Sequence, residues 1–401
     1  MSRGELTQEG IEFGVTGARW SRIAGVIGLI GLVITVARAL TIEHGAEAFF
    51  RAYLVNLMFF LSLALGGLFF VLISHLVRAG WSDVLRRIAE VLAWSILPLT
   101  AAAAVLLFGL HELYEWSHAE AVADDPLLQH KAAWLNPTFF MIRFAFYFVV
   151  WNLLAWFFLR QSVRQDSSRD YRLTIQMERL AAPGTIFFAM TVTFASFDYI
   201  MSLYPHWYST IFGVYYFSGC VLGIFSLVSI VAVGLERAGK LRQVLVIGHY
   251  HDLGRMMFAF VMFWAYIAVS QFVLIWYANI PEETEWYAVR KHGGWWTMSM
   301  VLLFGHFVVP FLWLMSRHVK RRKGMLVSAA VFLLLMHWLD LYYLIMPESI
   351  PAGPSIGLLD LGCFLMLGGL LFAAVFWRLG RANLIPIGDP RLDESLGLEH
   401  V

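Results

Sequence analysis

The chain contains ten apolar segments, each long enough to cross a lipid bilayer. A transmembrane helix needs about 20 predominantly apolar residues, because an α-helix advances about 1.5 Å per residue. A water-soluble core of this chain length cannot bury so many uninterrupted apolar runs. We therefore predict an all-α integral membrane protein whose spans cover residues 20–40, 52–77, 88–110, 138–159, 182–203, 210–236, 254–277, 295–316, 325–346 and 356–377.

The composition agrees with this class and excludes others. Hydrophobic residues make up 60% of the chain and charged residues 14%, with a mean hydropathy of +0.69. The basic residues are spread over short loops instead of forming one stripe, so nucleic acid is not an expected partner. The two cysteines, Cys220 and Cys363, fall inside predicted spans and match no metal-ligand spacing. We expect them to be buried packing residues and expect no metal site.

The distribution of basic residues predicts the orientation. Of the 29 Lys and Arg residues, 23 fall in the N-terminal tail, the alternate loops and the C-terminal tail, and 5 fall in the other loops. Cytoplasmic loops of membrane proteins carry such an excess of positive charge. The strongest marker is "RHVKRRKG" at 317–324. We therefore predict that both termini are cytoplasmic, which requires an even number of spans.

One internal repeat can be seen in the fifth and ninth spans. Asp198 lies seven residues before Pro205 in "FDYIMSLYP", and Asp340 lies seven residues before Pro347 in "LDLYYLIMP". The two spans are four apart and so run in the same direction. The repeat predicts two tandem four-helix bundles at 52–209 and 210–347, peripheral helices in 20–51 and 348–378, and cytoplasmic tails at 1–19 and 379–401.

Ionisable side chains within the spans are costly in hydrocarbon and need a partner or water. His337 and Asp340 interrupt an otherwise apolar run, and their spacing is expected to place them on one helix face. His306 in the eighth span is predicted at a similar depth, beside His337. Arg143 and Asp198 are predicted to share a depth nearer the outer surface and to form an ion pair.

Other ionisable groups occur towards the span ends, with His75 and Glu90 on the inner side and Glu112 and Asp360 on the outer side. Histidine titrates near neutral pH and a buried carboxylate can be shifted towards it, so a graded series of such groups suits proton transfer. The candidates for a proton path are His75, Glu90, Glu112, Arg143, Asp198, His306, His337, Asp340 and Asp360.

The same residues also have a purely structural interpretation. His337 would then donate a hydrogen bond to a carbonyl or to Asp340, and Arg143 would form only a structural pair with Asp198. For His75 and Glu90 we favour a position in water at the membrane interface.

A haem is an alternative use for the histidines, but His306 and His337 supply one facing pair at most. The chain has no CxxCH motif, no phosphate-binding Walker loop and no cysteine set for an iron–sulfur cluster. We expect this chain to hold no redox cofactor itself.

Two long stretches carry a resemblance to a known family: "SFDYIMSLYPHWYSTIFGVYYFSG" (196–219) and "HYHDLGRMMFAFVMFWAYIAVSQFVLIWYANIPEETEWY" (249–287). They resemble the ActF-type membrane subunit of alternative complex III, within the NrfD/PsrC-like family, and the likeness covers nearly the whole chain. The resemblance implies a subunit of a quinol:electron-acceptor oxidoreductase in the bacterial inner membrane. It also implies two four-helix bundles.

The resemblance further implies partners. These are a homologous ActC-type membrane subunit, the subunits that carry iron–sulfur clusters and c-type haems, and, as a further candidate, a terminal oxidase. Electrons pass from quinol through those subunits to cytochrome c or an oxidase, so this chain alone is not expected to be catalytic.

In the family, the quinol site is assigned to the ActC-type chain. An aspartate in the D-x6-P context takes part there, as does a histidine of the fourth span. Asp198 matches the aspartate, but Arg143 is the ionisable group of the fourth span here. This departure favours a proton-conducting or coupling element. It leaves open a second quinone-binding subunit using Asp198 and Arg143, a scaffold, and a free-standing ion-coupled transporter.

Overall fold

The computed structural model describes residues 7–398, and in this range it contains long helices and no β-strand. Ten of these helices are long and apolar enough to cross a membrane, which confirms the predicted all-α, multi-span fold. They are Gly14–Ala39 (α2), Gly45–Leu76 (α3), Gly80–Leu113 (α4 to α6), Pro137–Ser168 (α9), Tyr171–Leu203 (α10 and a short 3-10 turn), Phe212–Arg237 (α11), Ile247–Ala278 (α12), Gly293–Met315 (α14 and α15), Lys323–Ile345 (α17) and Leu358–Leu379 (α18).

Several helices are longer than the apolar runs that predict them, because polar turns extend beyond the hydrocarbon layer. The fifth span is the clearest case: α10 begins at Tyr171 instead of the predicted residue 182. Its start is fixed by the side chain of Asp170, which accepts a hydrogen bond from the backbone N–H of Arg172 at 2.9 Å. At the end of α9, Arg169 has a φ of 50°, which stops that helix.

Two spans are interrupted where the sequence has a proline. The third span changes from α4 (Asp83–Trp94) to α5 (Ile96–Ala104) near Pro98, whose ring conflicts with the carbonyl four residues earlier. The eighth span contains a π-helical segment, Leu303–Val308, just before Pro310. Proline lacks the N–H that would bond the carbonyl of His306, so the helix is widened at the residue that carries this imidazole.

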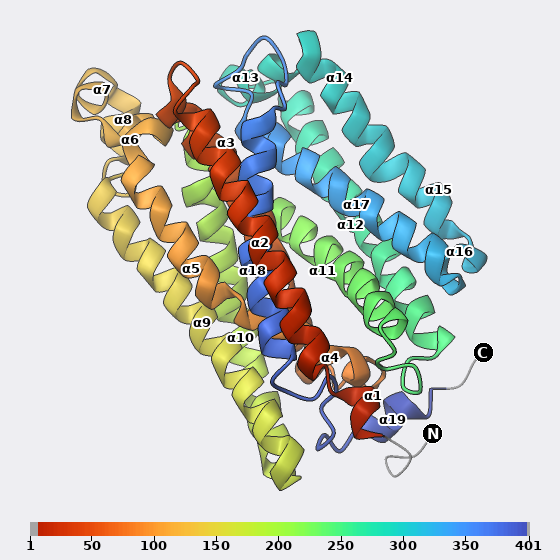
Figure 1. Ribbon diagram of the computed structural model, residues 1–401. Helices are drawn as coiled ribbons and strands as arrows, with labels where there is room; N and C mark the ends of the chain where they lie inside the picture. The colour runs from red at the N-terminus through yellow and green to blue at the C-terminus, as the bar shows by residue number, and fades with distance from the viewer. Residues whose placement is uncertain (1–6, 399–401) are drawn as a thin grey trace.

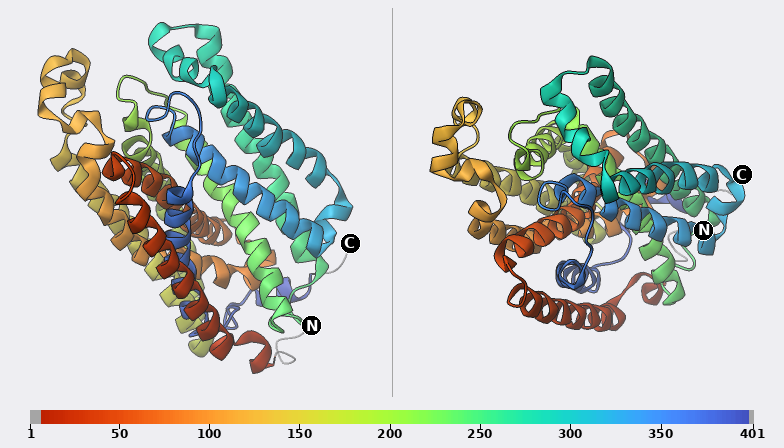
Figure 2. Two further views of the ribbon diagram at one scale, coloured as in Figure 1. Left: turned by 45° about the horizontal axis from the view of Figure 1, so that its top comes forward. Right: turned by 90° about the horizontal axis from the view of Figure 1, so that it is seen from above.

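Helices α3 and α11 form the buried centre of the molecule and contact each other. Helices α9 and α10 lie on one side of them, and α12, α14 and α15 lie on the other (Figures 1 and 2). Helix α17 packs on both central helices, α11 and α3, and also contacts α12 and α14. The division into two tandem bundles stays a prediction.

Helices α2 and α18 pack against each other along their lengths outside this centre (Figure 1). Small residues allow the close approach. A Cβ atom added to Gly369 would lie 2.3 Å from the Cα atom of Gly28, and one added to Gly31 would lie 2.3 Å from the backbone nitrogen of Met366. Close packing through small residues is characteristic of helices that associate in membranes.

The helices end in two clusters of short elements. At one end, here called the terminal end, lie α1 (Gln8–Ile11) and α19 (Leu392–Leu396) (Figure 1). At the opposite end, here called the loop end, lie α7 (Ala119–Asp124), α8 (Pro126–Lys131) and α13 (Pro281–Arg290). The prediction that the terminal end faces the cytoplasm remains a prediction.

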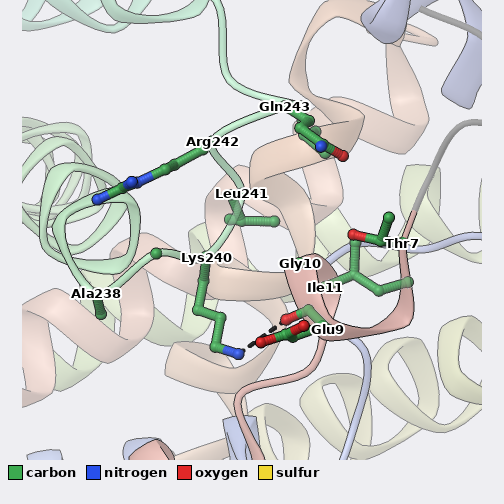
Figure 3. A pocket seen from close by; sticks show the side chains of 11 residues that line it. Thr7, Glu9, Gly10, Ile11, Ala238, Lys240, Leu241, Arg242 and Gln243 are labelled. Atoms are coloured by element: carbon green, nitrogen blue, oxygen red, sulfur yellow. Dashed lines mark hydrogen bonds between the residues drawn. The ribbon is translucent and has the colours of Figure 1, made fainter.

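The N-terminal segment is fixed to the loop between α11 and α12. Lys240 Nζ donates to the carbonyl of Glu9 at 2.8 Å, beside a small pocket whose walls are formed by the two segments (Figure 3). The backbone N–H of Leu241 donates to the carbonyl of Gly10 at 2.9 Å. On its other side this segment meets the C-terminal tail, where the N–H of Leu384 donates to Ile11 at 2.8 Å. Both described tails are thus part of the folded terminal end.

Candidate functional site

Asp340 lies inside the second half of the molecule without a cationic partner among residues 7–398. Its side chain is 2% exposed and accepts two hydrogen bonds, from Tyr215 Oη to Oδ1 at 2.6 Å and from Trp264 Nε1 to Oδ2 at 3.0 Å. The indole of Trp264 also stacks against His306, with ring centroids 3.9 Å apart. These four residues, from α11, α12, the π segment and α17, form the Asp340 cluster.

His306 is the member of this cluster with unused hydrogen-bonding atoms. It is buried, and neither ring nitrogen has a hydrogen-bond partner in the described part of the chain. Buried polar atoms in folded proteins nearly always have a partner, which is an internal water where the protein supplies none. Single-turn π segments of this kind occur frequently at functional sites.

His337 points to the first half of the molecule, towards α3. Its Nε2 lies 2.8 Å from Ser62 Oγ, and the Ser62 hydroxyl donates its only proton to the carbonyl of Phe59 at 2.6 Å. The hydrogen-bond network therefore assigns the imidazole proton to Nε2, which donates to Ser62. Nδ1 is then an acceptor with no donor among residues 7–398, and it faces the backbone of Gly219 on α11.

His337 and Asp340 do not hydrogen-bond to each other, although their spacing places them near one helix face. His337 hydrogen-bonds to α3, whereas Asp340 hydrogen-bonds to α11 and α12. Residues three apart on an α-helix differ in direction by about 60°. In a helix that packs on neighbours from both halves, this angle is enough to send the two side chains to different partners.

The predicted ion pair between Arg143 and Asp198 is confirmed. Arg143 Nε and Nη2 donate to the two carboxylate oxygens at 2.8 and 2.9 Å. Tyr147 Oη and Trp134 Nε1 donate to the same carboxylate at 2.8 and 3.0 Å. The carboxylate therefore accepts four hydrogen bonds, about as many as its lone pairs allow. We call these four residues the Asp198 cluster.

His75 and Glu90 do not lie in water, contrary to the interpretation that the sequence favoured. Each is 1% exposed. Glu90 accepts hydrogen bonds from Arg86 Nε at 3.2 Å and from Arg87 Nε at 3.0 Å. His75 stacks on Phe158, and neither of its ring nitrogens has a partner within the described range.

The C-terminal tail explains this burial, because it folds over the start of α4. Asp389 pairs with Arg86, which also pairs with Asp83, and Ser395 Oγ donates to the carbonyl of Trp81 at 2.8 Å. Burial alone would raise the pKa of Asp389, but the nearby Arg86 guanidinium outweighs it and holds that pKa below its ordinary value. We call Arg86, Asp83, Glu90 and Asp389 the Arg86 cluster. It was not predicted, because in the sequence Arg86 looks like an ordinary positive charge of an inner loop.

The two remaining candidates differ in exposure. Glu112 is exposed at the loop end, in α6 (Leu110–Leu113). Asp360 is buried and caps α18, with Oδ2 accepting from the N–H of Gly357 at 2.9 Å and Oδ1 without a partner among the described residues. The structure thus brings together Arg143 with Asp198 and His306 with Asp340, and it leaves Glu112 in solvent.

A cavity of about 400 Å³ adjoins the Asp340 cluster, and the sequence did not predict it. It lies between α12, α13 and α14, and Tyr215 and Trp264, the two donors to Asp340, form part of its wall. Most of its lining is apolar or aromatic. Such a cavity depends on how side chains from several helices fail to fill a space, which no local sequence pattern encodes.

The fold and these clusters define a multi-span helical membrane protein with titratable groups buried in its interior. Among the described residues, no group of three or more His, Cys, Asp or Glu side chains is placed to hold a metal ion. No protein-family model and no curated protein matches the chain.

Proposed function

We propose that this chain is a membrane subunit of a quinol:electron-acceptor oxidoreductase of the alternative complex III type, and that it contributes a proton-conducting element around His306, His337 and Asp340. The observation that carries the proton-conducting role is a set of buried imidazole nitrogens without protein partners near a carboxylate without a cation.

Proton transfer requires groups that can gain and lose a proton and that water can connect. His306 and His337 together leave three ring nitrogens without partners among residues 7–398. Water is the simplest group to satisfy them, since polar internal spaces are usually hydrated. Asp340 is held by two neutral donors, so no fixed positive charge binds its proton-accepting oxygens.

Unpartnered buried atoms also occur on both sides of this centre. His75 lies towards the terminal end, and Asp360 Oδ1 lies towards the loop end. In this proposal, His75 continues the proton path towards the terminal end, and Asp360 continues it towards the loop end. The surrounding Arg86 and Asp198 clusters are bound by arginine and are assigned a structural role.

The respiratory assignment is supported by the likeness of residues 196–219 and 249–287 to ActF-type chains. In this proposal, partner subunits hold the c-type haems and iron–sulfur clusters. A further partner is an ActC-type membrane subunit. The inner membrane is the location, and the charge distribution supports cytoplasmic termini. The alternative of quinone binding at Asp198 has less support, because Arg143, Tyr147 and Trp134 already occupy that carboxylate.

The test is to measure protons translocated per electron for the assembled complex in liposomes, with Asp340→Asn and His337→Ala combined. We expect this ratio to fall while quinol oxidation continues. Glu120→Gln, which changes an exposed acid at the loop end, is the matched control. An unchanged ratio in a normally assembled double variant would contradict the proton-conducting role.

Asp198→Asn in the same assay distinguishes the quinone alternative. If Asp198 serves quinol oxidation in this chain, the variant loses electron transfer in complexes that still assemble. We expect instead that every loss of activity in this variant follows a loss of assembled complex.

A further inference from the structure

The cavity beside the Asp340 cluster is bordered by exposed side chains of a candidate membrane span. Its volume of about 400 Å³ lies within the range of small-ligand sites, about 300–1,000 Å³. Aromatic side chains supply much of its wall, among them Trp264, Phe272 and Phe307. Val269 and Phe272 on α12 are 48% and 39% exposed, and both belong to a membrane span. Residues of both α12 and α14 line the cavity, so a ligand could enter it sideways between these two spans.

The loop end of the cavity is cationic. Arg290, the last residue of α13, lines it and is 1% exposed. Its guanidinium donates to the carbonyls of Trp286 at 2.8 Å, Tyr343 at 3.1 Å and Leu344 at 3.3 Å, and to the hydroxyl of Tyr204 at 3.3 Å. Its Nε has no partner, and no carboxylate pairs with this arginine, in the described part of the chain.

Lys291 lines the same cavity directly after Arg290 and is exposed, so two adjacent positive charges lie at this end. No acidic side chain lines the cavity. Two of the three acids of α13, Glu282 and Glu285, line a different cavity, which Trp286 also borders. The ionisable side chains that line this cavity are therefore positive, at an end of the molecule whose loops carry several acids.

We infer that this cavity binds an anionic membrane lipid. The phosphate group would lie at Arg290 and Lys291, and one acyl chain would occupy the aromatic cavity while the rest of the lipid stays in the bilayer. Basic pockets between transmembrane helices bind anionic headgroups, and hydrogen bonds from arginine to phosphate are among the strong ones. The bilayer supplies no hydrophobic driving force for this step, so the acyl chain would be held by van der Waals contact with the aromatic walls.

This site goes beyond the proposed proton path and does not depend on it. Arg290 holds the final carbonyls of α17, the helix that carries Asp340. A lipid bound at Arg290 would thus stabilise the end of that helix.

The test uses the full-length chain, delipidated in neutral detergent, and follows thermal unfolding as lipid is added. A ligand that binds only the folded state raises the unfolding temperature with concentration. We expect phosphatidylglycerol to do so and phosphatidylcholine to have a much smaller effect. Equal shifts with the two lipids would overturn the inference.

Two variants locate the effect. Ala268→Phe fills the cavity, and Lys291→Gln removes the exposed cation. Each is expected to reduce phosphatidylglycerol retention in native mass spectrometry at least about tenfold, a change equivalent to about 1.4 kcal/mol. The matched controls are Ala259→Phe and Arg255→Gln, exposed positions on the same α12 away from the cavity. Retention unchanged in the two test variants would overturn the site.

Inorganic phosphate provides the last arm of the test. Phosphate alone should leave the unfolding temperature almost unchanged, because it cannot use the apolar cavity. A shift as large as that of phosphatidylglycerol would overturn the role of the acyl chain. The proton-to-electron ratio of Lys291→Gln is expected to stay at the wild-type value, so failure of one proposal can be told from failure of the other.

Discussion

Asp198 and Asp340 occupy equivalent positions in the sequence, seven residues before a proline at the end of a span, yet their surroundings differ. Asp198 accepts four hydrogen bonds, two of them from the guanidinium of Arg143. Asp340 accepts two, both from neutral donors. One carboxylate is fixed in a buried ion pair, whereas the other shares the contact residue Trp264 with His306, an imidazole with unpartnered nitrogens.

The difference shows that a repeated motif can preserve a helix end without preserving its chemistry. A buried ion pair is costly to break and restricts both partners to one charge state. A buried carboxylate without a cation can exchange its proton where water connects it to an imidazole, as we propose for Asp340. We therefore assign the Asp198 cluster to structure and the Asp340 cluster to proton transfer.

The largest expected effect follows from breaking the Asp198 ion pair. Arg143→Leu leaves a carboxylate buried without its cation, and we expect a loss of about 3–5 kcal/mol in stability. Arg143→Leu combined with Asp198→Asn removes both charges and should recover a large part of this loss. Denaturant unfolding in detergent measures the stability of the single and of the double variant. A single variant as stable as wild type would show that the pair is not what holds these helices.

The Arg86 cluster should contribute to stability as the Asp198 cluster does, because its carboxylates are also paired with arginine. The pKa of Asp389 is lowered from its ordinary value near 3.8, so its stabilisation is present above that pH and is lost as the pH falls through the folded-state pKa. At pH 6, Asp389→Asn should lower the free energy of unfolding by about 1.5–3 kcal/mol relative to wild type, the value of a hydrogen bond to a charged group.

The difference in unfolding free energy between Asp389→Asn and wild type should become smaller as the pH is lowered to 3. Glu9→Gln, an exposed acid at the same end, serves as the control and should follow wild type throughout. A stability difference that does not change with pH would argue against an ion pair between Asp389 of the C-terminal tail and Arg86.

The smallest expected change in stability is that of Asp340→Asn. The amide oxygen can still accept from Trp264, and the amide nitrogen can donate to the Tyr215 hydroxyl once that hydroxyl rotates. We expect a loss of no more than about 1 kcal/mol, typical of one neutral hydrogen bond. Asp198→Asn should cost several times more, since it leaves Arg143 unpaired. Equal losses in these two variants would remove the distinction between the two clusters.

Much of the fold could be predicted from the sequence, because a bilayer sets the length and apolarity of each span. The Arg143 pairing was predictable from depth alone, since hydrocarbon offers an arginine few other partners. The partners of His337 were not predictable, because they depend on how α17 rotates between α3 and α11. The burial of Glu90 was missed because its partners Arg86 and Arg87 are in turn paired with residues distant in sequence, Asp389 and Asp166.

The most direct test of the central distinction is an experimental structure of the assembled complex at a resolution that shows ordered water. We predict waters within hydrogen-bond distance of the ring nitrogens of His306 and of His337 Nδ1, and none in contact with the Asp198 carboxylate, whose acceptor positions are filled. A dry environment around both histidines, or equal hydration of Asp198 and Asp340, would contradict the account.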